Sequence, residues 1–445
     1  MVTTQQRIAP PPHYRALFGA ALGDLPGAAT LPCRRLREES FARFEALGFP
    51  GPKAEAWKYT QLAPLAKLEF RLPEPVEIGH ADIAPFLVDD VAARLVFVNG
   101  RFAADLSDVL SAEKGITVTS LDQALERGDP DCLGLLPEDD DQRGLSALNG
   151  ALAAGGCLIS LAGQAAPRGP VQLLFVSIGR DQPALISPRN LVMLGDGARL
   201  DLIESHVALG GGRNLTNLVN RIVVGRGARL RHDRLQLGET AGSLIGRTAY
   251  RIAADARLTQ TLATLGGGLV RNETLALIEG SGAELQLNGL YLTRDRQHVD
   301  NTIRVDHASP GSVSDQFYKG VLDGEARAVF AGKIIVRRDA QKTNAYQANN
   351  NLLLSPDVEI DTKPELEIFA DDVKCSHGAT SGELDERELF YLRSRGLDPD
   401  TARSMLTFAF AHEVLERFAN PTVAAQAKRE LLRWLPGGAQ LGELA

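Results

Sequence analysis

Cysteine is scarce in this sequence. Only four of the 445 residues are cysteines, and no two of them form a C-x-x-C pair; they are Cys33, Cys132, Cys157 and Cys375. This scattering argues against a disulfide framework and against a zinc site closed by four thiolates of this chain alone. Any metal bound here therefore needs ligands from elsewhere.

A net positive charge and long apolar runs are also missing. The formal net charge is -8, which gives no electrostatic reason to bind nucleic acid or an anionic membrane surface. No stretch of about eighteen uninterrupted apolar residues occurs, and residues 1–9 lack the continuous apolar segment of a secretion signal. We therefore expect a cytoplasmic protein with neither nucleic acid nor a membrane as a partner.

Aromatic residues make up only 6% of the chain, whereas glycine is abundant, with 43 residues. This balance favours many tight turns over a globular helical bundle. Hydrophobic residues amount to 44%, enough for a sizeable core, and the length predicts about two to three domains.

One phrase recurs in the middle of the chain. It reads Gly-Ala-Arg-Leu at 197–200 and 227–230, Asp-Ala-Arg-Leu at 255–258 and Gly-Ala-Glu-Leu at 282–285. Its alanines, at positions 198, 228, 256 and 283, lie 30, 28 and 27 residues apart, a spacing typical of stacked repeats. Apolar, strand-like runs flank these phrases, without helices between them. We therefore predict a β-solenoid whose coils pair in parallel and whose four alanines occupy equivalent places.

A β-sandwich is the competing interpretation of the same region. Strands of a sandwich usually follow one another at about 8 to 12 residues, without a longer self-similar period. The recurrence therefore favours the solenoid. We predict an N-terminal mixed, mostly helical domain at 1–154, the solenoid core at 155–384 and a C-terminal helical domain at 385–445.

Helix signals support the two flanking regions. The N-terminal region predicts a helix over 35–47 that ends at Gly48, and a strand followed by a turn over 94–100. In the C-terminal region, helices are expected to begin at Asp385, at Asp398 with Pro399, and at Asn420 with Pro421; the last runs to Trp434.

A thiol and an imidazole lie one residue apart just before the C-terminal helices. If this segment is extended, Cys375 and His377 point to the same face, because alternate residues of a strand do so. Three uses remain open. His377 could activate Cys375 as a nucleophile; the pair could supply ligands to iron or zinc at a site that a partner chain completes; or Cys375 could be a packing residue and His377 a turn residue before Gly378.

Several phrases resemble one known family. They are Asn-Asn-Asn-Leu-Leu-Leu-Ser at 349–355, the run from Asp361 to Thr380 that contains Cys-Ser-His-Gly-Ala-Thr, Leu-Phe-Tyr-Leu-Arg-Ser-Arg-Gly at 389–396, Ala-Glu-Ala-Trp-Lys-Tyr-Thr at 54–60, Asp306–Pro310 and Gln316–Gly320. Together they are similar to the SufB/SufD family of iron–sulfur cluster assembly proteins. The Cys-Ser-His phrase looks like the SufD branch, because SufB has a His-Glu-Ala-Thr type sequence there.

The resemblance implies a right-handed parallel β-helix between helical N- and C-terminal domains, and a non-catalytic scaffold subunit. It implies pairing with a SufB-like paralogue and with a SufC-like ABC ATPase that docks on the C-terminal helices. It places the site at His377, with Cys375 beside it, where a nascent iron–sulfur cluster or entering iron would bind in the complex only. The isolated chain is expected to hold no cofactor and to form a homodimer. For His307, which also matches a family position, we expect a structural role, and no residue marks a flavin site.

Two enzymatic interpretations are weaker. The chain lacks the phosphate-binding sequence Gly-x-x-x-x-Gly-Lys-Ser/Thr, so it is not expected to be the ATPase itself. A β-helix hydrolase or lyase acting on polysaccharide would normally require a secretion signal and a cluster of carboxylates or basic residues along the solenoid flank, and neither is evident.

Overall fold

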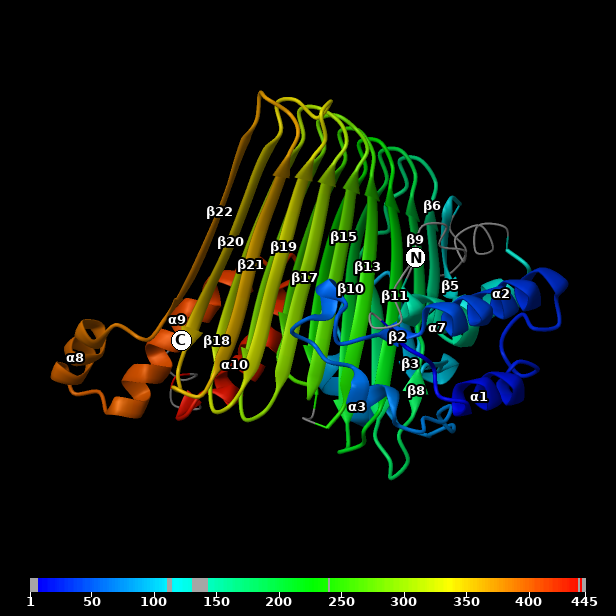
Figure 1. The fold of residues 1–445 in the computed structure, drawn as a ribbon, viewed down its shortest axis with the longest axis horizontal. Helices are drawn as coiled ribbons and strands as arrows, with labels where there is room; N and C mark the ends of the chain where they lie inside the picture. Colours follow the sequence, from blue (N-terminus) through cyan, green and yellow to red (C-terminus); the bar gives the residue numbers. More distant parts are fainter. Residues whose placement is uncertain (1–6, 110–113, 130–142, 239–240, 439–440, 442–445) are drawn as a thin grey trace.

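Two long sheets of mainly parallel strands dominate the computed structural model, which describes residues 7–109, 114–129, 143–238, 241–438 and 441 (Figure 1). From β6 onward, successive long strands alternate between the two sheets, so the chain winds into a parallel β-helix. The predicted solenoid is therefore confirmed, and the β-sandwich is not the fold.

Each sheet is a continuous ladder. The first contains, in spatial order, β22 (Lys374–Gly382), β20 (Asn344–Leu353), β18 (Val313–Leu322), β16 (Glu284–Thr293), β14 (Arg257–Thr264), β12 (Arg229–Leu237), β10 (Arg199–Leu209), β7 (Val171–Ile178), β3 (Ala93–Val98) and β4 (Arg101–Phe102). The second contains β21 (Glu359–Ile368), β19 (Arg327–Val336), β17 (His298–His307), β15 (Leu269–Ile278), β13 (Ser243–Ile252), β11 (Leu215–Val224), β9 (Arg189–Leu194), β6 (Cys157–Leu161) and β5 (Ile116–Ser120), with β8 (Leu185–Ile186) pairing to β11.

The recurring phrase forms the turn into four successive strands of the first sheet, β10, β12, β14 and β16. Its four alanines are fully buried, and the residue after one alanine donates its N–H to the alanine carbonyl of the preceding coil, as in Arg229 to Ala198 (2.8 Å) and Arg257 to Ala228 (2.9 Å). The equivalence of the alanines is thus confirmed. The position before each alanine has a positive φ, which glycine adopts without steric cost and which Asp255 adopts at φ 58°.

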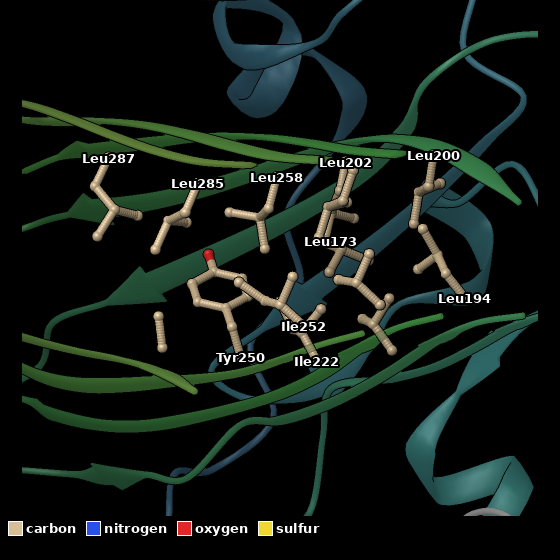
Figure 2. Packing of buried hydrophobic residues seen from close by; sticks show 14 of the residues in the cluster. Leu173, Leu194, Leu200, Leu202, Ile222, Tyr250, Ile252, Leu258, Leu285 and Leu287 are labelled. Atoms are coloured by element: carbon tan, nitrogen blue, oxygen red, sulfur yellow. The ribbon is translucent and has the colours of Figure 1, made fainter. Parts of the chain in front are cut away.

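The inward-facing leucines of the phrase fill the β-helix. Leu200, Leu230, Leu258 and Leu285 are consecutive partners in the ladder, and each is at most 2% exposed. They face apolar side chains of the second sheet, such as Ile222 and Ile252 (Figure 2). Burying one such side chain stabilises the fold by roughly 1.5–3 kcal/mol, so this column is a main source of stability.

The N-terminal region covers the first-coil end of the solenoid. The predicted strand is confirmed as β3, which pairs with β7, and β5 pairs with β6. The helices are α1 (His13–Ala21), α2 (Leu31–Leu47), α3 (Ala63–Ala66), α4 (His80–Ile83), α5 (Leu121–Glu126) and α7 (Gly144–Leu152), with 3-10 turns η2 (Glu55–Trp57), η3 (Ala84–Phe86) and η4 (Ala104–Leu106) and the small β1–β2 pair (Arg7–Ile8, Phe49–Pro50). Helix α2 includes the predicted helix over 35–47 but begins earlier, because Pro32 suits a first turn.

The phrase at 54–60 docks this region onto the second sheet. The Arg271 guanidinium lies 4.0 Å from the Trp57 ring centroid and donates to the Ala56 carbonyl at 2.8 Å. Arg271 also forms a buried ion pair with Asp300, which accepts a hydrogen bond from Thr60. The phrase is therefore a contact between the N-terminal region and β15 and β17.

The three predicted C-terminal helices are present as α8 (Glu386–Ser394), α9 (Pro399–Leu415) and α10 (Pro421–Trp434). Asp385, Asp398 and Asn420 cap them as expected, each accepting backbone N–H groups. Helices α9 and α10 pack their apolar faces on the outer face of the first sheet, against side chains such as Leu235 and Leu290. Helix α8 buries none of its residues and projects beyond the last coil (Figure 1). No helix of the described residues is long and apolar enough to cross a membrane.

Candidate functional site

The last strand of the first sheet carries the predicted pair. Cys375 and His377 both lie on β22, with Ala345 and Gln347 as their ladder partners on β20. Alternate residues of a strand share a face, and both partners are buried in the solenoid. The predicted orientation is therefore confirmed: the thiol and the imidazole lie on the inner face of the last coil, and their α-carbons are about 6.6 Å apart along the strand at roughly 3.3 Å per residue.

Both residues continue columns of inward-facing side chains that run from β10 to β22. The column of Cys375 contains, in ladder order, Leu200, Leu230, Leu258, Leu285, Ser314 and Ala345. The column of His377 contains Leu202, His232, Gln260, Leu287, Gln316 and Gln347. Cys375 and His377 are the last members of these two columns. A further coil, if there were one, would bury both side chains.

No strand of the described residues continues either sheet beyond this coil. Strands β21 and β22 end the two ladders, so each presents one edge with unpaired backbone groups. The imidazole of His377 is exposed there, and Ile368 and Phe369 nearby in sequence are 41% and 61% exposed. An open, partly apolar end of this kind is suited to cover by another protein surface.

Cys375 is half-buried and packs at the edge of a small cluster that contains Val336, Ala345 and Ala370. Burial raises the pKa of its thiol, while a hydrogen bond from the Ala345 backbone lowers it to a smaller extent. A raised pKa keeps the sulfur protonated near neutral pH. This disfavours the nucleophilic use of Cys375, since the thiolate is the reactive form.

The pair does not by itself complete a metal site. Across the described ranges, no three or more His, Cys, Asp or Glu side chains converge so that they could hold a metal ion. Of the other cysteines, Cys33 and Cys157 are buried elsewhere, and Cys132 lies outside the described residues. The arrangement can therefore offer one imidazole and one thiol to a target that arrives from the open end.

Comparison with known proteins identifies the family. A family model described as "SUF system FeS cluster assembly, SufBD core domain" matches residues 176–410, more than half of the chain. The chain belongs to the SufBD family. A second model, the SufBD protein N-terminal region, matches residues 11–173, so the resemblance found in the sequence is confirmed.

Relatives match this SufBD-family chain along most of their length. It is 32% identical over 396 residues to the iron-sulfur cluster assembly protein SufD of Escherichia coli, covering 88% of this chain and 91% of the relative. It is 32% identical over 386 residues to an iron-sulfur cluster assembly SufBD family protein of Synechocystis, covering 84% of each. It is 28% identical over 426 residues to the chloroplastic protein ABCI7 of Arabidopsis thaliana, covering 91% and 86%.

His307 has the structural surroundings that we expected. Its ring is buried in the solenoid, with Nδ1 2.7 Å from the Ser312 hydroxyl and Nε2 2.9 Å from the Ser314 hydroxyl. Burial lowers its pKa to about 4, and nearby Asp306 opposes the shift only in part. The imidazole is therefore neutral and fully hydrogen-bonded, and it is not positioned for ligand binding at the open end.

This burial makes stability depend on pH. Because the ordinary histidine pKa is about 6.5, the unfolded chain binds more protons than the folded chain between about pH 6.5 and 4, so stability falls as the pH falls through this range. We expect wild type to lose about 3 kcal/mol more than His307→Gln over that interval. Denaturant titrations of both proteins at pH 6.5 and 4 measure the free energy of unfolding. An equal decrease in wild type and His307→Gln would contradict the prediction.

A buried ionic network in the solenoid was not predicted from the sequence. Glu204 is only 1% exposed, and its Oε1 accepts hydrogen bonds from His206 (2.7 Å) and Arg234 (3.1 Å). Its Oε2 accepts one from Asn220 (2.7 Å) and lies 3.2 Å from His232 Nε2. Burial alone would raise the pKa of this carboxyl, but Arg234 and the two histidines lower it well below its usual range.

The sequence held one weak signal for this network. Charged and histidine residues stand at alternate positions 204 and 206 and again at 232 and 234, in two runs that the period places about 30 apart. In an amphipathic strand such a pattern normally marks the solvent face, so periodicity alone assigns these side chains to the wrong side.

Proposed function

We propose that this SufBD-family chain is a non-catalytic scaffold subunit of a SufBCD-type complex for iron–sulfur cluster assembly. It pairs through the open end of its β-helix with a SufB-like paralogue and presents His377, with Cys375, to a nascent cluster or to entering iron. The observation that supports this best is the position of the pair, on the inner face of the last coil beside two unpaired strand edges.

The chemistry of the pair fits such a target. Neutral imidazole and thiolate are ligands that iron accepts, and cluster sites generally need more ligands than this chain brings together. A paralogue that covers the open end would supply the remaining ligands. The cluster or iron is the cargo of this complex, and the chain contributes to its binding.

Co-purification tests the proposal. The chain, co-expressed anaerobically with SufB-like and SufC-like partners, should elute with both and acquire the visible absorption of an iron–sulfur cluster. The chain purified alone should stay colourless after the same iron and sulfide treatment. Elution without partners, or a cluster on the chain alone, would contradict the proposal.

We propose that the ATPase docks on α8 in particular. Phe390 and Tyr391 on this helix are 74% and 57% exposed, whereas α9 and α10 already use their apolar faces to cover the first sheet. Exposed aromatic residues are the side chains most often found at the centre of protein interfaces.

Replacing both Phe390 and Tyr391 by serine should weaken ATPase binding by at least about tenfold, because an aromatic anchor contributes about 2 kcal/mol or more. Binding of the SufB-like partner should remain, since the open coil is untouched. Pull-down with each partner separately measures the two effects. Met405→Ser on α9, where Met405 is 39% exposed, is the control, and unchanged ATPase affinity of the double variant would place the contact elsewhere.

The isolated chain should be a dimer. Two unpaired strand edges and exposed apolar side chains at one end favour cover by a second copy when the paralogue is absent. Light scattering at micromolar concentration should give twice the chain mass of 47.9 kDa. A substitution that introduces charge at the end, Phe369→Asp, should shift the protein to monomer, and a monomeric wild type would contradict the prediction.

A further inference from the structure

A cavity of about 600 Å³ lies where the N-terminal region covers the first-coil end of the solenoid, and we call it the first-coil cavity. Its walls come from α1, the segment 72–75, the turn between β3 and β4, the first turn of α5, the end of α7, and β8. Helix α1 and β8 lie at the opposite end of the molecule from α8 (Figure 1). The volume falls within the range of about 300–1,000 Å³ that is usual for small-molecule sites.

The walls of the first-coil cavity are mainly apolar. Side chains from four elements line it, namely Leu17 of α1, Phe102 of β4, Leu152 of α7 and Ile186 of β8. Alanines leave the space between them, at 20 and 21 on α1 and at 154 just after α7. A ligand that fills this volume therefore needs an apolar body, because apolar surface gains most from leaving water here.

Two polar side chains of the lining have buried oxygen atoms without a hydrogen-bond partner among the described residues. Ser187 is only 6% exposed, and its Oγ has no partner. Asp122 lies in the first turn of α5, and its Oδ1 is buried and has none either. A carboxylate in the first turn of a helix stabilises that helix, but this does not compensate a buried oxygen that accepts no hydrogen bond. A donor from a ligand would compensate both atoms.

The charges around the first-coil cavity determine which kind of donor fits. Asp24, Glu74 and Asp122 contribute three carboxylates to the lining, whereas Arg101 is its one cation. Within the described part of the chain, Glu74 alone of these three carboxylates has an ion pair, with Arg180 at 3.8 Å. The excess of negative charge favours a cationic head group and disfavours a carboxylate or phosphate.

We propose that the first-coil cavity binds a small amphipathic amine. The apolar body of the ligand lies against the leucine, phenylalanine and isoleucine side chains of the walls. Its ammonium group pairs with Asp122 and donates to the buried Oδ1, and the Ser187 hydroxyl is a second acceptor, since an ammonium group has three N–H donors. The proposal does not depend on the function proposed above, because the cavity and the Cys375–His377 pair lie at opposite ends of the solenoid.

Calorimetric titration of the full isolated chain tests the proposal with three probes of equal chain length. n-Octylamine should bind saturably, with one molecule per chain. Octanoate, which carries the opposite charge, should bind at least about tenfold more weakly, and octan-1-ol should lie between the two, because a hydrogen bond to a charged group is worth about a factor of ten or more. Absence of saturable octylamine binding, or equal affinity for octylamine and octanoate, would overturn the proposal.

Two variants assign the binding to this cavity. Asp122→Asn keeps the shape of the side chain and removes its charge, so octylamine affinity should fall at least about tenfold while octan-1-ol affinity stays unchanged. Ala154→Leu fills the space without changing the charge and should weaken the binding of all three probes. Asp400→Asn is the matched control, because Asp400 is also a first-turn carboxylate, on α9, and does not line the cavity. Circular dichroism checks that each variant is folded, and unchanged octylamine affinity in either Asp122→Asn or Ala154→Leu would overturn the proposal.

Discussion

Replacing Glu204 by glutamine is expected to reduce the free energy of unfolding by about 3–5 kcal/mol, the usual cost of leaving one member of a buried ion pair without its partner. Arg234, only 3% exposed, would keep its charge inside the solenoid without a carboxylate. His206 and His232 would lose the Glu204 carboxylate, which now lies within hydrogen-bond distance of both rings. Chemical denaturation followed by circular dichroism measures the loss.

The same two strands provide the control. Asp201 on β10 pairs with Arg231 on β12 through an ion pair on the outer face, where the two side chains are 39% and 55% exposed. Asp201→Asn should reduce the free energy of unfolding by less than about 1 kcal/mol, because exposed ion pairs contribute little to stability. Equal losses in the two variants would show that burial does not determine the strength of the network.

A double variant separates the loss of charge balance from the loss of packing. Glu204→Met combined with Arg234→Met removes both charges and leaves two apolar side chains of similar length. Such replacements are often neutral or stabilising relative to the ion pair. The double variant should therefore recover part of the stability that Glu204→Gln loses, and a further loss would indicate that the remaining polar groups depend on both charges.

Loss of the imidazole should abolish cluster formation while leaving the complex assembled. His377 is exposed on the last coil and makes no contribution to the apolar clusters of the core, so His377→Ala should fold and bind both partners as wild type does. We expect the rate of cluster formation to fall at least about tenfold, because water fills an open iron position poorly. Anaerobic reconstitution followed by absorption spectroscopy measures this rate.

Cys375→Ala should be milder. Its sulfur packs beside Ala345 and Ala370, burial raises the pKa of the thiol, and a small apolar side chain can replace it there. Ser376→Ala, on the outer face between the two, is the control. A His377→Ala complex that builds clusters at the wild-type rate would remove the imidazole from the proposed site and leave only a structural role for this strand.

The sequence by itself determined the local features of this protein. The recurring phrase specified a turn with a positive φ before each alanine, because backbone strain at a turn depends on neighbouring residues alone. The helix caps at Asp385, Asp398 and Asn420 were equally local. The alternation of a strand was enough to place Cys375 and His377 on one face.

Only the tertiary structure decided which residues meet between coils. The contacts of Glu204 with Arg234, and of His377 with the column of Gln347, join residues 30 positions apart, and their register depends on the length of every turn between them. A shift of one residue would place each of these side chains on the opposite face of its strand. The same holds for α9 and α10. Their first residues were visible in the sequence, whereas the sheet face that buries them is assembled from strands spread over about 150 residues, from Ile203 on β10 to Leu352 on β20.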